Sequence, residues 1–198
     1  GEILAAMQGA VFKGGGDYPG NPFIIGSGPD ALLCRYKSGR RKLDPSDQLT
    51  LEFAGVYRQY HACLMRTLVV GEPSSRQHAM DQACREALHA CEAALQPGRA
   101  MGEVFAAHAS VMDAHGMQAH RLNACGYSLG TVYAPCWMDW PMFYADNPVV
   151  IDESMVFFLH MILMDSDAGQ AMTLGRTSIV TATGASPLSK ASLDLVVR

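Results

Sequence analysis

Residues 51–71 read LEFAGVYRQYHACLMRTLVVG, and this stretch decides the fold. Its apolar and β-branched residues fall into two runs, which predict strands over residues 49–57 and 63–70 joined by a short turn. Glu52 interrupts the first run at a position that faces inward in the predicted strand. Burying a carboxylate is costly unless it is paired or has a function, so Glu52 is the first candidate for a chemical role.

The rest of the chain predicts a layered α+β domain. Apolar residues recur at helical spacing over residues 3–11, and the run Gly14-Gly15-Gly16 ends that helix. Two further helices are predicted over residues 76–95, with Ser74 or Ser75 as N-cap, and over residues 101–114. Short strands are predicted over 23–26, 31–36 and within 121–132, and a second long hairpin over 155–164 and 171–181. This order predicts a single domain, residues 1–198, with an antiparallel sheet and helices on one face.

Composition excludes several classes of function. Of 198 residues, 49% are apolar and 17% are charged, and the net charge of −4 gives no electrostatic reason to expect nucleic acid or an anionic membrane as partner. No apolar run approaches the roughly 20 residues that span a bilayer. The six cysteines form no CxxC pair, which favours free thiols in a reducing cytoplasm. The chain opens in helical periodicity without an initiator methionine or signal peptide, so we expect a C-terminal fragment of a longer protein.

Four segments carry a resemblance to a known family. They are YHACLMRTLVVG at 60–71, GYSLG at 126–130, MVF at 155–157, and the last long strand with Thr177 and Val180. Together they resemble the creatinase, aminopeptidase P and methionine aminopeptidase family over nearly the whole chain. The resemblance implies the pita-bread fold, with this chain as its C-terminal catalytic domain, and it implies a homodimer.

A second set of segments is similar to one branch of that family. LCRY at 33–36, LEFAG at 51–55, MRT at 65–67 and LHMILMDSD at 159–167 resemble the ectoine hydrolase branch. This resemblance implies a small-molecule substrate, ectoine, whose cyclic amidine ring is opened to an N-acetyl-diaminobutyrate.

The family resemblance also implies five metal-ligand positions, which this chain does not preserve. Peptidase members bind two metal ions through two aspartates, one histidine and two glutamates. The first four positions fall on Glu52, Cys63, Tyr127 and His160, and the fifth falls on or beside Gly175. Two divalent ions need several anionic oxygens, and one carboxylate remains, so we expect no metal and no other cofactor. A single zinc ion held by Cys63, His160 and Glu52 stays open as an alternative.

Each candidate at these positions has a chemical and a structural interpretation. Glu52 is a candidate nucleophile or general base at the amidine carbon, or else the partner of Arg58 or Arg66 in an ion pair. His160 interrupts the apolar run FFLHMIL and is a candidate acid or base for a ring nitrogen, or else a core histidine.

Two neighbouring candidates are less specific. Tyr127, between two small or polar residues, is a candidate hydrogen-bond donor to the substrate or to a developing charge, or else a packing residue. Cys63 is a candidate nucleophile beside a histidine, although its apolar flanks favour a small buried side chain.

Four residues are candidates for substrate binding. Arg35 suits the carboxylate of ectoine, because a guanidinium binds carboxylates in bidentate fashion; the alternative is a solvated strand-end arginine. Trp137, Trp140 and Phe143 belong to the aromatic loop CWMDWPMFY and are candidates for a pocket wall or a subunit interface. The other histidines lack ligand spacing, and we expect them at the surface.

The sequence therefore predicts a metal-independent hydrolase of a non-peptide C–N bond. Two alternatives remain: a Xaa-Pro metallopeptidase with a degenerate metal site, and an inactive family member that acts as a binding module.

Overall fold

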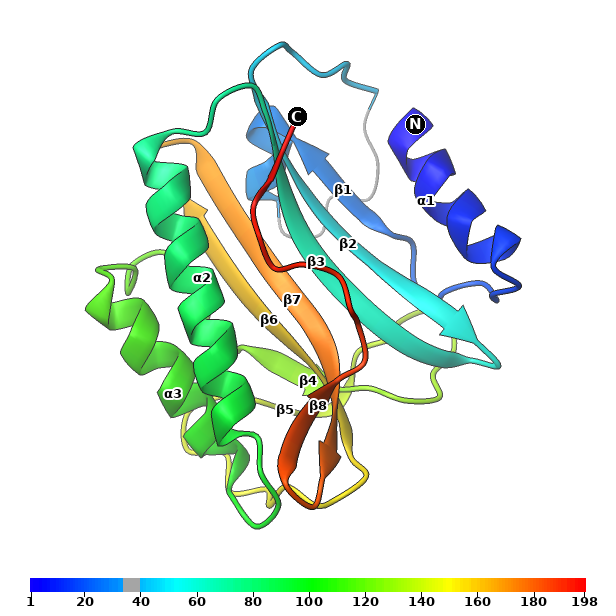
Figure 1. Cartoon of the computed structure of the whole chain (residues 1–198), viewed down its shortest axis with the longest axis vertical. Coiled ribbons are helices and arrows are strands. Elements are labelled where there is room, and N and C mark those ends of the chain that lie inside the picture. Colours follow the sequence, from blue (N-terminus) through cyan, green and yellow to red (C-terminus); the bar gives the residue numbers. More distant parts are fainter. Residues whose placement is uncertain (34–39) are drawn as a thin grey trace.

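The computed structural model describes residues 1–33 and 40–198, and within them the chain forms one curled, predominantly antiparallel sheet with helices packed against it (Figure 1). The sheet order is β1-β2-β3-β7-β6-β4-β5, with β8 paired to β7 and β9 paired in parallel to β3. The elements are α1 (Glu2–Lys13), β1 (Ile24–Ser27), the 3₁₀ helix η1 (Gly28–Leu32), β2 (Asp47–Tyr57), β3 (Tyr60–Val70), α2 (Ser75–Ala94), α3 (Met101–Ala114), β4 (Gly126–Ser128), β5 (Asp139–Met142), β6 (Val156–Asp165), β7 (Gln170–Thr181), β8 (Gly184–Pro187) and β9 (Val196–Val197).

The predicted β2–β3 hairpin is present, but its second strand begins three residues earlier than expected. Arg58 and Gln59 alone form the turn, with φ angles of 50° and 67°, and Tyr57 pairs directly with Tyr60. Two successive residues at positive φ suit the right-handed twist of a hairpin. The sequence shows no glycine at this turn, which is why the start of β3 was placed too late.

The second hairpin, β6–β7, pairs over its full length from Val156↔Ile179 to Asp165↔Gln170. The two hairpins meet along β3 and β7, where Leu64 lies opposite Arg176 and Met65 lies opposite Gly175. This seam joins the halves of the sheet and fixes how residues of β2 and β6 stand relative to one another.

The cross-strand register separates two faces of the sheet. On one face the Arg176 guanidinium bonds the Glu92 carboxylate of α2 at 2.6 and 2.7 Å, so this face bears the helices. Leu64 stands beside Arg176 on the same face, because directly paired residues point the same way. The opposite face carries a row of directly paired positions across β2, β3, β7 and β6: Glu52, Met65, Gly175 and His160.

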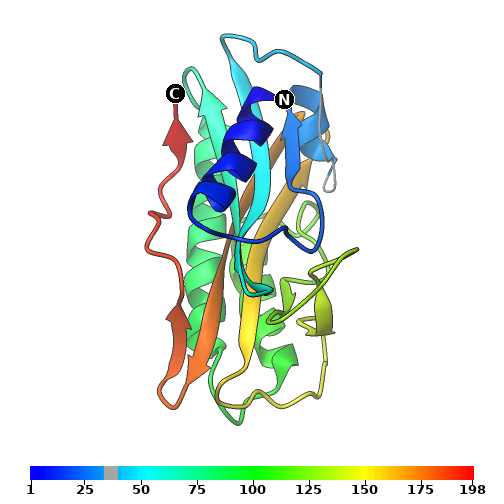
Figure 2. The ribbon, with the colours of Figure 1, turned by 90° about the vertical axis from the view of Figure 1, so that its right-hand side faces the viewer.

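Helix α2 follows from a capping box, in which the Ser74 hydroxyl accepts from the backbone of Gln77 and the Gln77 side chain accepts from the backbone of Ser74. It packs on the β6–β7 half of the sheet and on α3 (Figure 1), where Leu88 is fully buried. Helix α1 lies beside β2, away from α2 and α3 (Figure 2).

Two other expectations differ from the structure. The strand predicted over 31–36 is replaced at Ala31 and Leu32 by the end of η1, which Pro29 helps to start, since proline fits the first turn of a helix. Residues 34–36 of that prediction lie outside the described part of the chain. Within 121–132 only Gly126–Ser128 forms a strand. In the described residues, no helix combines the length and apolar character required to traverse a bilayer.

Candidate functional site

A buried hydrogen-bonded chain of three side chains marks the site face of the sheet. The Tyr127 hydroxyl donates to Oε1 of Glu52 at 3.1 Å, and Nε1–H of the Trp137 indole donates to the Tyr127 hydroxyl oxygen at 2.9 Å. All three are nearly inaccessible, with Glu52 6%, Tyr127 2% and Trp137 1% exposed. The inward carboxylate expected from the sequence is therefore present, and it is bonded to one of the other predicted site residues.

The loop that carries Trp137 is held from both sides. Its backbone N–H donates to Oδ1 of Asn21 at 3.1 Å, and the indole lies 6.3 Å from the Phe23 ring and 6.1 Å from the His61 ring. Gly20 packs against the backbone of residues 136 and 137, where a larger side chain would be crowded. Trp137 is thus fixed by the segment before β1 as well as by Tyr127.

His160 joins the same cluster from β6. Its ring centroid lies 5.6 Å from that of Tyr127 and 5.8 Å from that of Phe158, and its side chain is buried. The backbone N–H of His160 donates to the Cys125 carbonyl at 2.9 Å, which ties β6 to the residue before β4. The structure therefore gathers Glu52, Tyr127, Trp137 and His160.

Cys63 is present at the site but is held as a thiol. Burial, and next the negative charge of Glu52, raise the pKa of the Cys63 thiol well above its ordinary value. The backbone of Cys63 bonds the Thr177 hydroxyl in both directions. Because the thiolate is the nucleophilic form, this environment favours the structural interpretation of Cys63.

Tyr127 is likewise held in its neutral form. Burial raises the pKa of its phenol far above the ordinary value, and the adjacent negative charge of Glu52 adds to the effect. Tyr127 is therefore a hydrogen-bond donor to the carboxylate.

Two predicted binding residues do not join this cluster. Trp140 is 61% exposed, with its ring 5.9 Å from that of Tyr144. Phe143 was wrong as a pocket residue, since it is fully buried in the helix-side core with its ring 4.8 Å from that of Phe157. Phe143 bonds the backbone of Gly126, one residue from Tyr127, so strand alternation sends it to the other face. Arg35 lies outside the described residues.

The sequence predicts His61 and His108 at the surface, but both are buried, and His61 lies at the site. It is buried on the site side, Nδ1 lies 2.8 Å from the Gln59 carbonyl, and Nε2 accepts from the Gly20 N–H at 2.8 Å. Burial lowers the pKa of His61, which favours the neutral imidazole with a hydrogen bond at each ring nitrogen. Its position two residues before Cys63 in a strand is the signal that could have placed it on the same face.

The arginines proposed as ion-pair partners of Glu52 are directed elsewhere. Arg66 stands on the helix-bearing face and donates to the carbonyls of Met65 and Gly175 at 2.6 and 2.8 Å. The Arg58 guanidinium lies over the Tyr57 ring at 5.6 Å.

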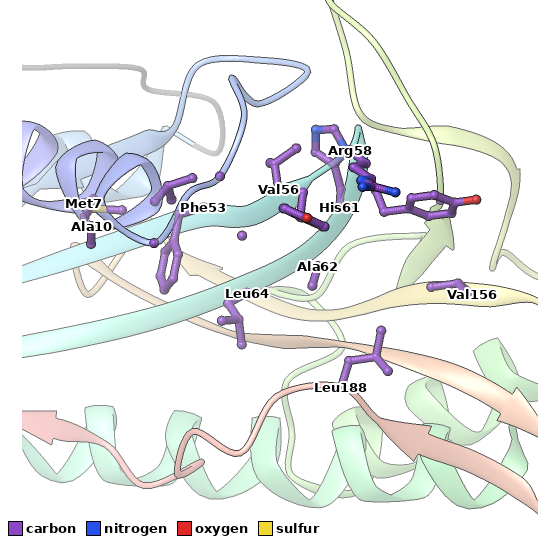
Figure 3. Close-up of a pocket in the computed structure, with 17 residues that line it drawn as sticks. Met7, Ala10, Phe53, Val56, Arg58, His61, Ala62, Leu64, Val156 and Leu188 are labelled. Atoms are coloured by element: carbon purple, nitrogen blue, oxygen red, sulfur yellow. The ribbon is translucent and has the colours of Figure 1, made fainter.

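A large groove lies beside this cluster and shares only His61 with the buried site residues described above. The groove of about 930 Å³ lies on the helix-bearing face, where Met7 of α1, Phe53, Leu64 and Leu188 line it (Figure 3). Next to Glu52, the described side chains enclose only about 10 Å³. The candidate site is therefore tightly packed, whereas the open groove is lined mainly by apolar side chains, with Arg58 and His61 at its edge.

Comparison with known proteins places this arrangement in a family. The model of metallopeptidase family M24 matches residues 1–182. The chain belongs to metallopeptidase family M24. It is 27% identical over 198 residues to the ectoine hydrolase of Halomonas elongata, covering 100% of this chain and 48% of the relative. It is 22% identical over 195 residues to the Xaa-Pro dipeptidase of Pyrococcus furiosus, covering 98% and 55%.

Solved structures of similar chains share the fold. The prolidase of Pyrococcus furiosus superposes with a TM-score of 0.89 at 21% identity, over 96% of this chain and 55% of that chain. The X-Pro aminopeptidase of Thermotoga maritima superposes with a TM-score of 0.91 at 17% identity, over 100% and 55%. These likenesses confirm the expected pita-bread fold, and this chain spans about half the length of the curated relatives that it matches.

The side chains present do not fit the dinuclear metal centre that the M24 family name implies. Of the five expected ligand positions, Cys63 is a thiol, Tyr127 is a phenol and Gly175 has no side chain. A Cβ at Gly175 would lie 2.9 Å from the Phe158 ring, which occupies the space of the missing ligand. Among the described residues, no three histidine, cysteine or acidic side chains come together in a way suited to a metal ion, which also counts against the zinc alternative.

Proposed function

We propose that the full protein is a metal-independent hydrolase that opens the amidine ring of ectoine. The observation that carries the proposal is the buried Glu52 carboxylate, which accepts a hydrogen bond from Tyr127. The family resemblance places Glu52 at a metal-ligand position. The 27% identity to an ectoine hydrolase across the whole chain supports the substrate. An M24 hydrolase that lacks most of the anionic metal ligands needs a protein side chain to attack the carbon or to activate water. Glu52 is that side chain.

The proposed reaction adds one water across a C–N bond of the ring. Glu52 either attacks the amidine carbon and is later released by water, or takes a proton from a water that attacks directly. The carbon gains an oxygen and becomes an amide carbonyl, the bond to one ring nitrogen breaks, and that nitrogen gains a proton. His160, whose ring centroid lies 5.6 Å from that of Tyr127, is the candidate to supply that proton. Tyr127 orients the Glu52 carboxylate.

Substrate binding extends the proposal beyond the described residues. Arg35 would bind the carboxylate of ectoine in bidentate fashion. Because the described side chains leave about 10 Å³ next to Glu52, we expect neighbouring side chains to move when substrate enters. The homodimer and the cytoplasmic location are also proposals; light scattering of the purified protein tests the first, and fractionation of cells tests the second.

The deciding experiment is turnover of ectoine by the full natural protein, with product followed by NMR in the presence and absence of EDTA. We expect turnover in both, and a loss of about a thousandfold for Glu52→Gln, in line with removal of a positioned base or nucleophile. The exposed Glu153→Gln is the matched control and is expected to behave like the parent protein. Activity that EDTA abolishes would refute metal independence. Cleavage of Xaa-Pro dipeptides restored by Mn²⁺ would instead support the peptidase alternative, and absence of any turnover would support the binding module.

A further inference from the structure

We propose that Trp137 is a positioning residue, which fixes the direction of the hydrogen bond from Tyr127 to Glu52 and thereby the orientation of the carboxylate. The expected effect on kcat rests on the proposed function, whereas the hydrogen-bonded chain from Trp137 to Glu52 does not depend on the substrate. The sequence predicts Trp137 in a pocket wall or a subunit interface. The structure gives it a different place, behind Tyr127 and out of solvent.

The indole and the phenol differ in the hydrogen bonds that they can form. An indole N–H is a donor only, whereas a phenol both donates and accepts. When Nε1–H of Trp137 donates to the Tyr127 oxygen at 2.9 Å, it takes up a lone pair of that oxygen and leaves the Tyr127 proton for Glu52, 3.1 Å away. The chain therefore runs in one direction, from indole to phenol to carboxylate. Donation to the Tyr127 oxygen also polarises the phenol, which strengthens the bond that it donates in turn.

Neighbouring residues hold the Trp137 side chain in place. The backbone N–H of Trp137 donates to Asn21, and the indole lies beside the rings of Phe23 and His61, so turning the indole away would break these ring contacts. His61 belongs to this support, because its Nε2 holds the Gly20 backbone beside Trp137. A fixed donor at the start of the chain transmits its orientation to the phenol and from there to Oε1 of Glu52.

The orientation of the Glu52 carboxylate depends on this hydrogen-bonded chain. A carboxylate anchored through one oxygen is restrained in rotation about its terminal bond, so the reacting geometry is set before substrate arrives. Without the indole N–H, the Tyr127 hydroxyl loses one partner and its preference for donating to Glu52 weakens. The effect is on orientation during reaction, and therefore on kcat more than on KM.

A double-mutant cycle tests the kinetic part with the full natural protein. Trp137→Phe keeps an aromatic ring and removes the N–H, and we expect it to lower kcat for ectoine about tenfold while KM stays within about twofold. Tyr127→Phe removes the link to Glu52. If Trp137 acts through Tyr127, Trp137→Phe adds no further loss to Tyr127→Phe. Equal, additive losses of kcat in both backgrounds would mean that Trp137 only supports the local packing, and would overturn the proposal.

A spectroscopic arm remains decisive even if ectoine is not the substrate. In a ¹H–¹⁵N spectrum, the indole signal that disappears in Trp137→Phe belongs to Trp137, and the solvent-exposed Trp140 serves as internal reference. We expect the Trp137 indole proton to exchange slowly and to move upfield in Tyr127→Phe, where its acceptor is gone. Tyr133→Phe, at an exposed tyrosine, is the matched control and should leave it unmoved. A Trp137 signal that is unchanged in Tyr127→Phe would refute the hydrogen-bonded chain, whereas absence of ectoine turnover alone would refute only the proposed function.

Discussion

The seam between the two hairpins should be the most sensitive point of the sheet to loss of a single hydroxyl. The β3–β7 ladder contains only three directly paired positions. At one end, the Thr177 hydroxyl accepts from the Cys63 N–H at 2.7 Å and donates to the Cys63 carbonyl at 3.0 Å. At the other end, the Thr67 hydroxyl accepts from the Thr173 N–H at 2.7 Å. Two threonine side chains thus extend the ladder beyond its backbone pairs.

Thr177→Val removes this extension with almost no change in shape. Both backbone groups of Cys63 that face Thr177 are buried, and each would lose its partner. At about 1.5 kcal/mol for each group left unbonded, the free energy of unfolding should fall by about 3 kcal/mol. For a domain of this size that corresponds to a melting temperature lower by about 6 to 12 °C.

Urea titration followed by circular dichroism measures the loss, with Thr177→Ser and Thr183→Val as controls. Thr177→Ser keeps the hydroxyl and loses one methyl group, so we expect a loss of about 1 kcal/mol. Thr183 is exposed in a turn, and its replacement should change stability by less than about 0.5 kcal/mol. If Thr177→Val were as stable as the parent protein, or less affected than Thr177→Ser, the hydroxyl would not carry the seam and the reasoning would be wrong.

Two further predictions follow from buried positions. Gly175→Ala should destabilise the protein by about 2 kcal/mol in a thermal or urea melt, because the new Cβ would lie 2.7 Å from a backbone carbonyl and 2.9 Å from the Phe158 ring. Gly55→Ala is the control and should be nearly neutral, because the space around Gly55 is open. Equal losses of stability in the two variants would refute the crowding at Gly175. Burial lowers the pKa of His108 from 6.5 to about 4. Between about pH 4 and pH 6.5 the unfolded protein therefore binds more protons at His108 than the folded protein does. Stability should accordingly fall as pH drops from about 6.5 to about 4, by at most about 3 kcal/mol. His108→Leu should flatten that part of the stability profile, the exposed His78→Leu should not, and an unchanged profile in His108→Leu would contradict the assignment.

The sequence predicts the sheet and helices well where periodic patterns are long. The two hairpins, the capped α2 and the inward position of Glu52 all follow from alternation of apolar residues and from Ser74 as N-cap. The site depends on other information. Tyr127 and Trp137 meet through a loop without periodicity. Phe143, predicted at a pocket wall or a subunit interface, lies in the core because its backbone pairs with that of Gly126. Such contacts are set by tertiary register, which a local pattern does not encode.

The family resemblance implies five metal-ligand positions in this chain. The packing at these positions helps to distinguish a peptidase that has lost its metal site from a different enzyme. A site that merely lost its ligands would be expected to retain voids where side chains had shortened, since each void costs stability. Here the ring of Phe158 fills the space at Gly175. A hydrogen bond from Trp137 complements the phenol of Tyr127, and that phenol in turn bonds Glu52. Side chains from β2, β4, β6 and the Trp137 loop are mutually compatible in this arrangement, which supports a site adapted to a carboxylate without metal more strongly than one in decay.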